Sequence, residues 1–150
     1  MNWKQSNSKK LMQAVGERMC QFLGSEIDME VSSIEFEFRE IKRLKLNYLT
    51  SIISVEGSVK VLFAFSFDKP VVQKIVEIYT EDIDTSDMPM TEYEEETVAD
   101  IINVVLGNSL SSFSISGKII DLSTPFVISE AKTIYRHNNA VFYTARVVTS

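Results

Sequence analysis

Cysteine and histidine are nearly absent from this chain of 150 residues, which contains one of each, Cys20 and His137. Cys20 stands in a helical apolar pattern, where a lone thiol is interpreted as a small core residue and fits a reducing compartment. His137 belongs to a polar stretch far along the chain, so a nucleophile paired with a general base is poorly supported. The sequence also has no glycine-rich loop that cradles phosphate, which argues against a hydrolase of small molecules.

Clusters of basic residues are missing as well. The net charge is −6, and the densest basic run is Lys42-Arg43-x-Lys45. Because binding to phosphate backbones needs a concentrated basic face, we expect no nucleic-acid partner. No apolar run approaches the length that spans a bilayer, and the polar first ten residues lack the apolar core of a signal peptide. We therefore expect no membrane association and a cytoplasmic location.

What remains is the composition of an ordinary globular protein. Apolar residues make up 45% of the chain and charged residues 24%, both within the usual range. A chain of 150 residues has the size of one domain and can bury a core without disulfides. No linker-like stretch divides it, so we predict a single domain over residues 1–150.

Hydrophobic periodicity predicts both helices and strands. The predicted helices cover about 6–23, with Ser6 or Asn7 as the N-cap, 69–79 and 91–112; the predicted strands cover 26–38, 48–55, 58–67 and 140–147. Two hairpins are predicted, one at Glu56-Gly57 and one at His137-Asn138-Asn139, which would join residues 133–135 to the last strand. The order of elements predicts an α+β fold, with long amphipathic helices packed on one face of a largely antiparallel β-sheet.

An acidic connector covers residues 80–90, between the second and third predicted helices. We considered it as a cation site, because it carries several carboxylates: Glu81, Asp82, Asp84 and Asp87. It lacks the glycine and the closing glutamate of an EF-hand loop. We therefore expect no metal there.

The helix predicted over residues 91–112 is the element around which the rest of the chain is organised. Thr91 and Glu94 fit a capping box at its start. Its apolar residues recur at helical spacing and form one broad face: Val98, Ile101, Ile102, Val105 and Leu106. The opposite side carries Glu96, Asp100, Asn103 and Gly107, at steps of four, three and four residues. These four therefore form a single stripe that points away from the core.

This stripe is the candidate site. Asp100 and Asn103 place a carboxylate and a carboxamide one helical turn apart. A carboxylate pairs with a cation on a partner, and an amide both donates and accepts hydrogen bonds and so can orient a water molecule. Gly107 leaves a shallow place where another surface can approach. The alternative interpretation is an ordinary solvated helix face with acidic residues.

These residues, together with three other segments, resemble the CheC/CheX family of chemotaxis phosphatases, and most closely its CheX group. Asp100-Ile101-Ile102-Asn103, followed by Gly107-Asn108, is similar to the acid-x-x-Asn motif of the family with its downstream Gly-Asn. The motif is single, as in CheX. The other matching segments are Phe22-Leu23-Gly24, Gly57-Ser58-Val59 and Ser123-Thr124-Pro125.

The resemblance implies a phosphatase that removes the phosphoryl group from the aspartate of a phosphorylated CheY-type receiver domain. In that role Asn103 orients the attacking water, and Asp100 pairs with a lysine of the receiver. Glu96 adds attraction at the rim, Val104 gives an apolar contact, and Gly107 leaves room for the partner. No cofactor or metal of its own is expected, because the Mg²⁺ belongs to the receiver. A homodimer is also implied.

The motif departs from the family pattern at its acid. Asp100 stands where the family usually has a glutamate, which is longer by one methylene, and Glu96 stands where the CheC-type pattern has Asp or Ser. The interval from Asn103 to Pro125 is also about one residue shorter than in that pattern. We expect a shorter reach to the receiver and a reduced activity. The alternative function is a catalytically weak or inactive binding or scaffold module in two-component signalling.

Overall fold

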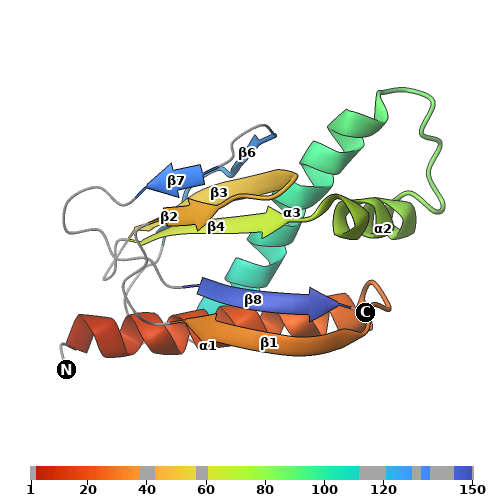
Figure 1. Cartoon of the computed structure of the whole chain (residues 1–150). Coiled ribbons are helices and arrows are strands. Elements are labelled where there is room, and N and C mark those ends of the chain that lie inside the picture. The colour runs from red at the N-terminus through yellow and green to blue at the C-terminus, as the bar shows by residue number, and fades with distance from the viewer. Residues whose placement is uncertain are drawn as a thin grey trace. The chain divides into compact units, whose positions relative to one another are not determined.

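A computed structural model of the chain describes residues 3–37, 43–56, 61–111, 121–129, 133–135 and 144–149. Figure 1 shows its elements in space, and their order along the chain is α1 (Trp3–Ser25), β1 (Val31–Glu37), β2 (Arg43–Lys45), β3 (Leu49–Glu56), β4 (Val61–Phe67), α2 (Lys69–Tyr79), α3 (Met90–Ser111), β5 (Asp121–Leu122), β6 (Phe126–Ile128), β7 (Thr133–Tyr135) and β8 (Thr144–Thr149). The pairings β1–β8, β3–β4, β3–β5 and β3–β6 are all antiparallel. The predicted α+β class with antiparallel sheets is confirmed.

The elements group into two compact units, and each unit draws on both halves of the sequence. The α2 unit contains Lys45–Val104 and Lys118–Thr133, and the α1 unit contains Met1–Leu44, Val105–Gly117 and Ile134–Ser150. Helix α3 contributes residues to both units. A single domain over residues 1–150 stays a prediction.

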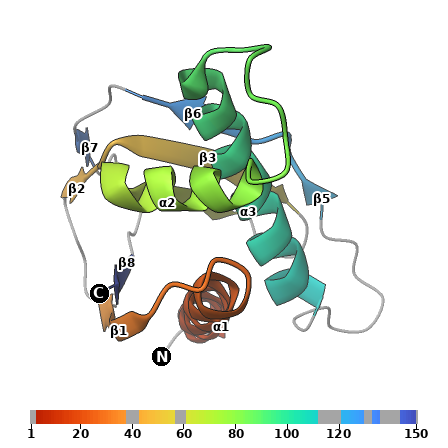
Figure 2. The same ribbon diagram turned by 90° about the vertical axis from the view of Figure 1, so that its right-hand side faces the viewer.

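In the α1 unit, helix α1 packs against the β1–β8 pair, as Figure 2 shows. On the apolar side of this helix Leu11, Val15 and Phe22 are buried, whereas Met19 is half-buried. The helix begins at Trp3, so the prediction of a cap at Ser6 or Asn7 is wrong, and it ends one residue after Gly24.

A close approach between α1 and β1 depends on Gly16. A Cβ atom at this position would lie 2.9 Å from Cδ1 of Ile34 and 2.9 Å from Cε1 of Phe36. Both distances are below an ordinary van der Waals contact. The absence of a side chain at Gly16 therefore lets the helix lie this near to the strand.

The strand predicted to begin at residue 26 begins at Val31 instead. The chain leaves α1 through a turn in which the Met29 amide donates to the Leu23 carbonyl at 2.9 Å, and Asp28 has a φ of 55°. Ile27 and Met29 are nevertheless buried, at 0% and 9% exposure. The apolar alternation in this stretch therefore comes from two buried residues of the turn, Ile27 and Met29, and not from the start of strand β1.

In the α2 unit, β3 is the central strand. It pairs with β4 on one edge, and with both β5 and β6 on the other. Opposite residues Ile53 and Phe63 are buried, as are Leu49 and Phe67. Strands β3 and β4 confirm the two runs predicted in this region, while the turn predicted at Gly57 lies outside the described residues. Residues 123–125 lie between β5 and β6.

The last two strands each pair with a strand from the first half of the chain. Among the described residues β7 pairs with β2, and β8 pairs with β1. Strand β8 is described over Thr144–Thr149, and residues 140–143 of the predicted last strand lie outside the described residues, as does the turn predicted at 137–139. The hairpin between residues 133–135 and the last strand therefore stays a prediction, whereas the two long-range partners could not be predicted from a local pattern.

Helices α2 and α3 match their predicted ranges to within one residue. Asp68 is the N-cap of α2, and Pro70 lies in the first turn, where its missing amide costs little. Val72, Ile75 and Val76 form the buried side of α2. None of the helices in the described part of the chain combines the length and the apolarity needed to cross a bilayer.

Two glycine substitutions test the close approach of α1 to β1. A Cβ atom added at Gly107 on α3 would have no other atom within 4 Å, in contrast to one at Gly16. We expect Gly107→Ala to raise the free energy of unfolding by about 0.5–1 kcal/mol, because alanine is the better helix former. Gly16→Ala should instead lower it by about 1 kcal/mol, because Ile34 and Phe36 must move. Urea unfolding measures both, and an equal gain in the two variants would contradict the packing assigned to Gly16.

Candidate functional site on helix α3

Helix α3 has one face without any contact with water. The five apolar residues predicted for this face, Val98, Ile101, Ile102, Val105 and Leu106, are each 0% exposed. Rotation of the helix about its axis would bring some of these side chains into solvent, which costs about 1.5–3 kcal/mol for each one exposed. The buried face therefore fixes which side chains the helix presents to a partner.

The opposite face presents the predicted stripe. Glu96, Asp100, Asn103 and Gly107 are all exposed. Asp100 and Asn103 lie one turn apart on a continuous helix, so their side chains project in nearly the same direction. Neither side chain has a hydrogen-bond or ion-pair partner among the residues that the structure describes. The carboxylate and the amide are thus accessible to a group from outside.

Two apolar or small residues flank this pair. Val104 follows Asn103 and is 42% exposed. Gly107, one turn further on, has open space where a side chain would be.

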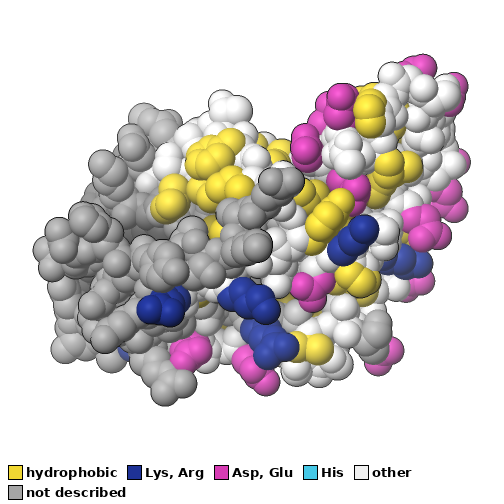
Figure 3. All heavy atoms as spheres, turned by 45° about the horizontal axis from the view of Figure 1, so that its top comes forward, with side chains coloured by type: hydrophobic (Ala, Val, Ile, Leu, Met, Phe, Trp, Pro, Cys, Tyr) yellow, Lys and Arg dark blue, Asp and Glu magenta, His cyan; other side chains and the backbone are white. Residues whose placement is uncertain are grey.

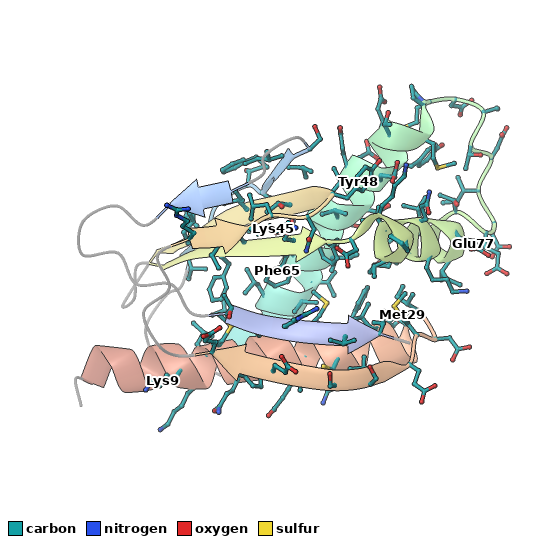
Figure 4. All side chains as sticks on the ribbon, viewed as in Figure 1. Lys9, Met29, Lys45, Tyr48, Phe65 and Glu77 are labelled. Carbon is teal, nitrogen blue, oxygen red and sulfur yellow. The ribbon has the colours of Figure 1, made fainter. Side chains whose placement is uncertain are left out.

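The start of α3 is held by a polar contact that the sequence did not predict. The Tyr48 hydroxyl donates to Oε1 of Glu94 at 3.2 Å, and Glu94 is only 6% exposed. Tyr48 is labelled in Figure 4. The prediction that Glu94 forms a capping box with Thr91 is wrong, because the helix begins at Met90 and the Glu94 carboxylate is turned to Tyr48. The other carboxylate oxygen of Glu94 is buried and has no hydrogen-bond partner among the described residues.

The ring of Tyr48 also contacts a lysine side chain of α2. Nζ of Lys69 lies 5.5 Å from the centre of the Tyr48 ring, within the range of a cation–π interaction. The pKa of Tyr48 is raised above 10.0, first by burial and then by the charge of Glu94 and the hydrogen bond to it. The tyrosine is therefore neutral at physiological pH and acts as a donor, joining α3 to the segment before β3.

The exposed side of α3 is strongly acidic. Its exposed carboxylates are Glu92, Glu95, Glu96 and Asp100, and the helix contains no lysine or arginine. Figure 3 shows acidic side chains gathered over the start of α3 and the connector before it. Such a surface favours the approach of a partner whose docking face carries cations.

A pocket adjoins the stripe on the side of α2. It has a volume of about 420 Å³ and is lined by Tyr79, Thr80, Ile83, Tyr93, Glu96, Thr97, Ala99 and Asp100. Sequence reasoning found Glu96 and Asp100 but missed the apolar lining. Ile83 alone gave a signal, because it is an aliphatic residue isolated in an acidic connector.

Other candidate chemistry receives little support. In the part of the chain that the structure describes, no three side chains of His, Cys, Asp or Glu are grouped as a metal site would require. Cys20 is half-buried on α1, and its pKa is raised by burial and by the charge of Glu17. A raised pKa leaves the thiol protonated, which opposes a role as nucleophile.

Comparison with known proteins gives a consistent result. A family model described as chemotaxis phosphatase CheX matches residues 49–145, more than half of the chain. The crystal structure of chemotaxis protein CheX from Desulfovibrio desulfuricans superposes with a TM-score of 0.74 at 13% identity, over 93% of this chain and 91% of that one. Chemotaxis protein CheX from Vibrio vulnificus gives a TM-score of 0.63 at 19% identity, over 85% and 80%.

A third similar structure is the CheX–CheY–BeF₃–Mg²⁺ complex from Borrelia burgdorferi. It gives a TM-score of 0.52 at 16% identity, over 94% of this chain and 96% of that one. At such identities these structures establish the shared fold. No curated protein matches the chain significantly.

Removal of the Tyr48 hydroxyl tests the polar contact at the start of α3. We expect Tyr48→Phe to lower the free energy of unfolding by about 1–3 kcal/mol, because the buried Glu94 carboxylate loses its donor. Tyr93→Phe is the matched control, since the Tyr93 hydroxyl donates to the exposed connector at 3.3 Å; its cost should stay within about 0.5 kcal/mol. Urea unfolding of both variants measures the difference, and equal costs would contradict the role given to Tyr48.

The free energy of unfolding should also depend differently on pH in the wild-type protein and in Tyr48→Phe. Because the folded state raises the pKa of Tyr48 above 10.0, the folded state holds this proton more tightly than the unfolded state. The resulting stabilisation is complete below pH 10.0 and is lost as the pH rises through the higher folded-state pKa. The stability difference between the wild-type protein and Tyr48→Phe should therefore shrink in strongly alkaline buffer, whereas a constant difference would contradict the shift.

Proposed function

We propose, since the chain belongs to the CheX family of chemotaxis phosphatases, that it hydrolyses the aspartyl phosphate of a CheY-type response regulator. One observation carries the proposal. On a helix whose rotation is fixed by a fully buried face, Asp100 and Asn103 are both exposed, one turn apart, and without partners among the described residues. A pair of this kind is free to enter the phosphorylated pocket of another protein.

In this proposal Asn103 positions the nucleophile. Its carboxamide binds a water molecule by donating and accepting hydrogen bonds and holds it in line with the bond that breaks. The water oxygen forms a new bond to phosphorus, and the bond between phosphorus and the aspartate oxygen of the receiver breaks. The products are inorganic phosphate and the free aspartate carboxylate, and both protons of the attacking water leave with the phosphate as dihydrogen phosphate.

Asp100 sets the position of helix α3 relative to the phosphoryl group of the receiver. Its carboxylate pairs with the lysine of the receiver that contacts the phosphoryl group, and the three-residue spacing then places Asn103 beside the phosphorus. Glu96 adds attraction for cations at the rim of the interface. Val104 supplies an apolar contact, and Gly107 leaves space for the surface of the receiver.

Few residues are needed because the receiver brings most of the catalytic machinery. Its own Mg²⁺ and lysine supply the charge stabilisation of the phosphoryl group. This chain therefore requires no cofactor of its own, and its contribution is to position one water molecule. The related CheX from Borrelia burgdorferi, crystallised together with CheY and Mg²⁺, supports the choice of partner. A cytoplasmic location and a homodimer belong to the proposal as well.

The competing function is a scaffold that docks a receiver without accelerating hydrolysis. The two functions require different amounts of this protein relative to the phosphorylated receiver. A phosphatase shortens the lifetime of the phosphorylated receiver when it is present at far less than one molecule per receiver, whereas a scaffold changes that lifetime only at equal amounts. A panel of phosphorylated CheY-type receivers, each measured at both ratios, separates the two.

Asn103→Ala tests the positioning role. We expect kcat to fall by about 100-fold, the size of loss that misplacing a reacting group causes, with KM nearly unchanged because Asp100 still docks. Asn47→Ala, the same change at an exposed asparagine outside α3, is the control and should keep the wild-type rate. Phosphate release from the phosphorylated receiver is the measurement, and full activity of Asn103→Ala would remove this residue from the mechanism.

Two substitutions of Asp100 test its proposed ion pair with the lysine of the receiver. Asp100→Ala should raise KM by about tenfold, equal to about 1.4 kcal/mol, through the lost ion pair. Asp100→Glu restores the acid usual in the family and should match or raise the wild-type rate. If Asp100→Glu were as impaired as Asp100→Ala in the same phosphate-release assay, the ion pair would not be the function of this carboxylate.

A further inference from the structure

The pocket beside the stripe is composed of two different walls, all within the α2 unit. One wall is largely apolar and comes from the end of α2, the connector and the start of α3: Tyr79, Ile83 and Tyr93. The other wall comes from α3 and includes the carboxylates of Glu96 and Asp100. A volume of about 420 Å³ is large enough for one large side chain and part of its backbone.

The apolar wall is held by hydrogen bonds along the connector. The Thr80 hydroxyl donates to the Val76 carbonyl at 2.7 Å, and the Ile83 amide donates to the Thr80 carbonyl at 3.1 Å. The Tyr93 hydroxyl donates to the Asp84 carbonyl at 3.3 Å, which joins the connector to α3. These hydrogen bonds hold the connector turn in place in the free chain, so binding has less of this turn to order.

Ile83 is a large aliphatic side chain that lies mostly in solvent. It is 56% exposed, although every one of its described connector neighbours from Glu81 to Asp84 is acidic. An isolated aliphatic side chain at the edge of a preformed pocket resembles the apolar anchors of protein interfaces. It therefore indicates a partner with an apolar side chain of its own.

The charge around the pocket defines the chemistry of that partner further. None of the residues that line the pocket is a lysine or an arginine. Besides Glu96 and Asp100 in the wall, the exposed carboxylates Glu81, Asp82 and Asp84 lie on the connector. An apolar side chain flanked by a cationic residue complements both parts of this surface.

We infer that this pocket is the specificity-determining docking site for the receiver, and that it takes an aliphatic or aromatic side chain of the receiver flanked by a lysine or arginine. The inference rests on the proposed phosphatase function. Because Asp100 belongs both to the pocket wall and to the stripe, occupation of the pocket fixes the position of Asn103 one turn away. The pocket thus selects the partner, while Asn103 acts on it.

Two pocket variants and one control test the inference in the full-length chain. Ile83→Ser removes the apolar anchor, and Ala99→Leu fills the pocket from α3 with a good helix former. Leu62→Ser is the matched control, since Leu62 on β4 is 64% exposed and lies outside the pocket. The probe is the phosphorylated CheY-type receiver that the wild-type protein dephosphorylates fastest in the panel, and kcat and KM are measured separately.

We expect Ile83→Ser and Ala99→Leu each to raise KM by about tenfold with kcat within about twofold of the wild-type value, and Leu62→Ser to change neither. The inference is overturned if both pocket variants keep the wild-type KM while Asn103→Ala is impaired, because the function then stands without the pocket. If Asn103→Ala keeps full activity, the catalytic proposal itself fails. If no receiver of the panel is dephosphorylated, both fail together.

Discussion

The candidate site depends on the complete burial of one face of helix α3. Val98, Ile101 and Ile102 have no exposed surface, and successive residues on a helix are separated by about 100° of rotation. A turn of the helix by one residue would therefore exchange buried apolar groups for Asp100 or Asn103, at a cost of several kcal/mol. The same constraint that forms the core thus keeps a carboxylate and an amide directed at solvent, ready for another protein.

In the proposed function a single helix has two tasks at neighbouring positions. The stripe would provide the amide that positions the water, and the adjoining pocket would recognise the partner. Asp100 lines the pocket and belongs to the stripe, so in this proposal recognition and catalysis share one side chain. The acidic surface around them lacks basic residues on α3, which favours encounter with a cationic docking face and makes that encounter sensitive to salt.

Sequence periodicity predicted the elements better than it predicted their partners. The ranges of α2, α3, β3 and β4 follow from local pattern, because each buries one face with its own period. The pairings of β7 with β2 and of β8 with β1 were not predicted, because strands so far apart in the sequence share no local pattern. The stripe on α3 was visible from spacing alone, but Tyr48 and Ile83 were not. Their importance comes from contacts with Glu94 and with the pocket, which are distant in sequence or depend on the shape of the connector.

The central claim is that the Asn103 amide enters the phosphorylated pocket of a receiver and holds the attacking water there. The most direct measurement is a crystal structure of the full-length chain bound to a CheY-type receiver activated with beryllofluoride and Mg²⁺, where the BeF₃ group stands in for the phosphoryl group. The account predicts the Asn103 carboxamide within about 3 Å of a water that lies in line with the beryllium. A complex in which Asn103 lies away from the receiver's aspartate, with another face of the chain docked instead, would contradict it.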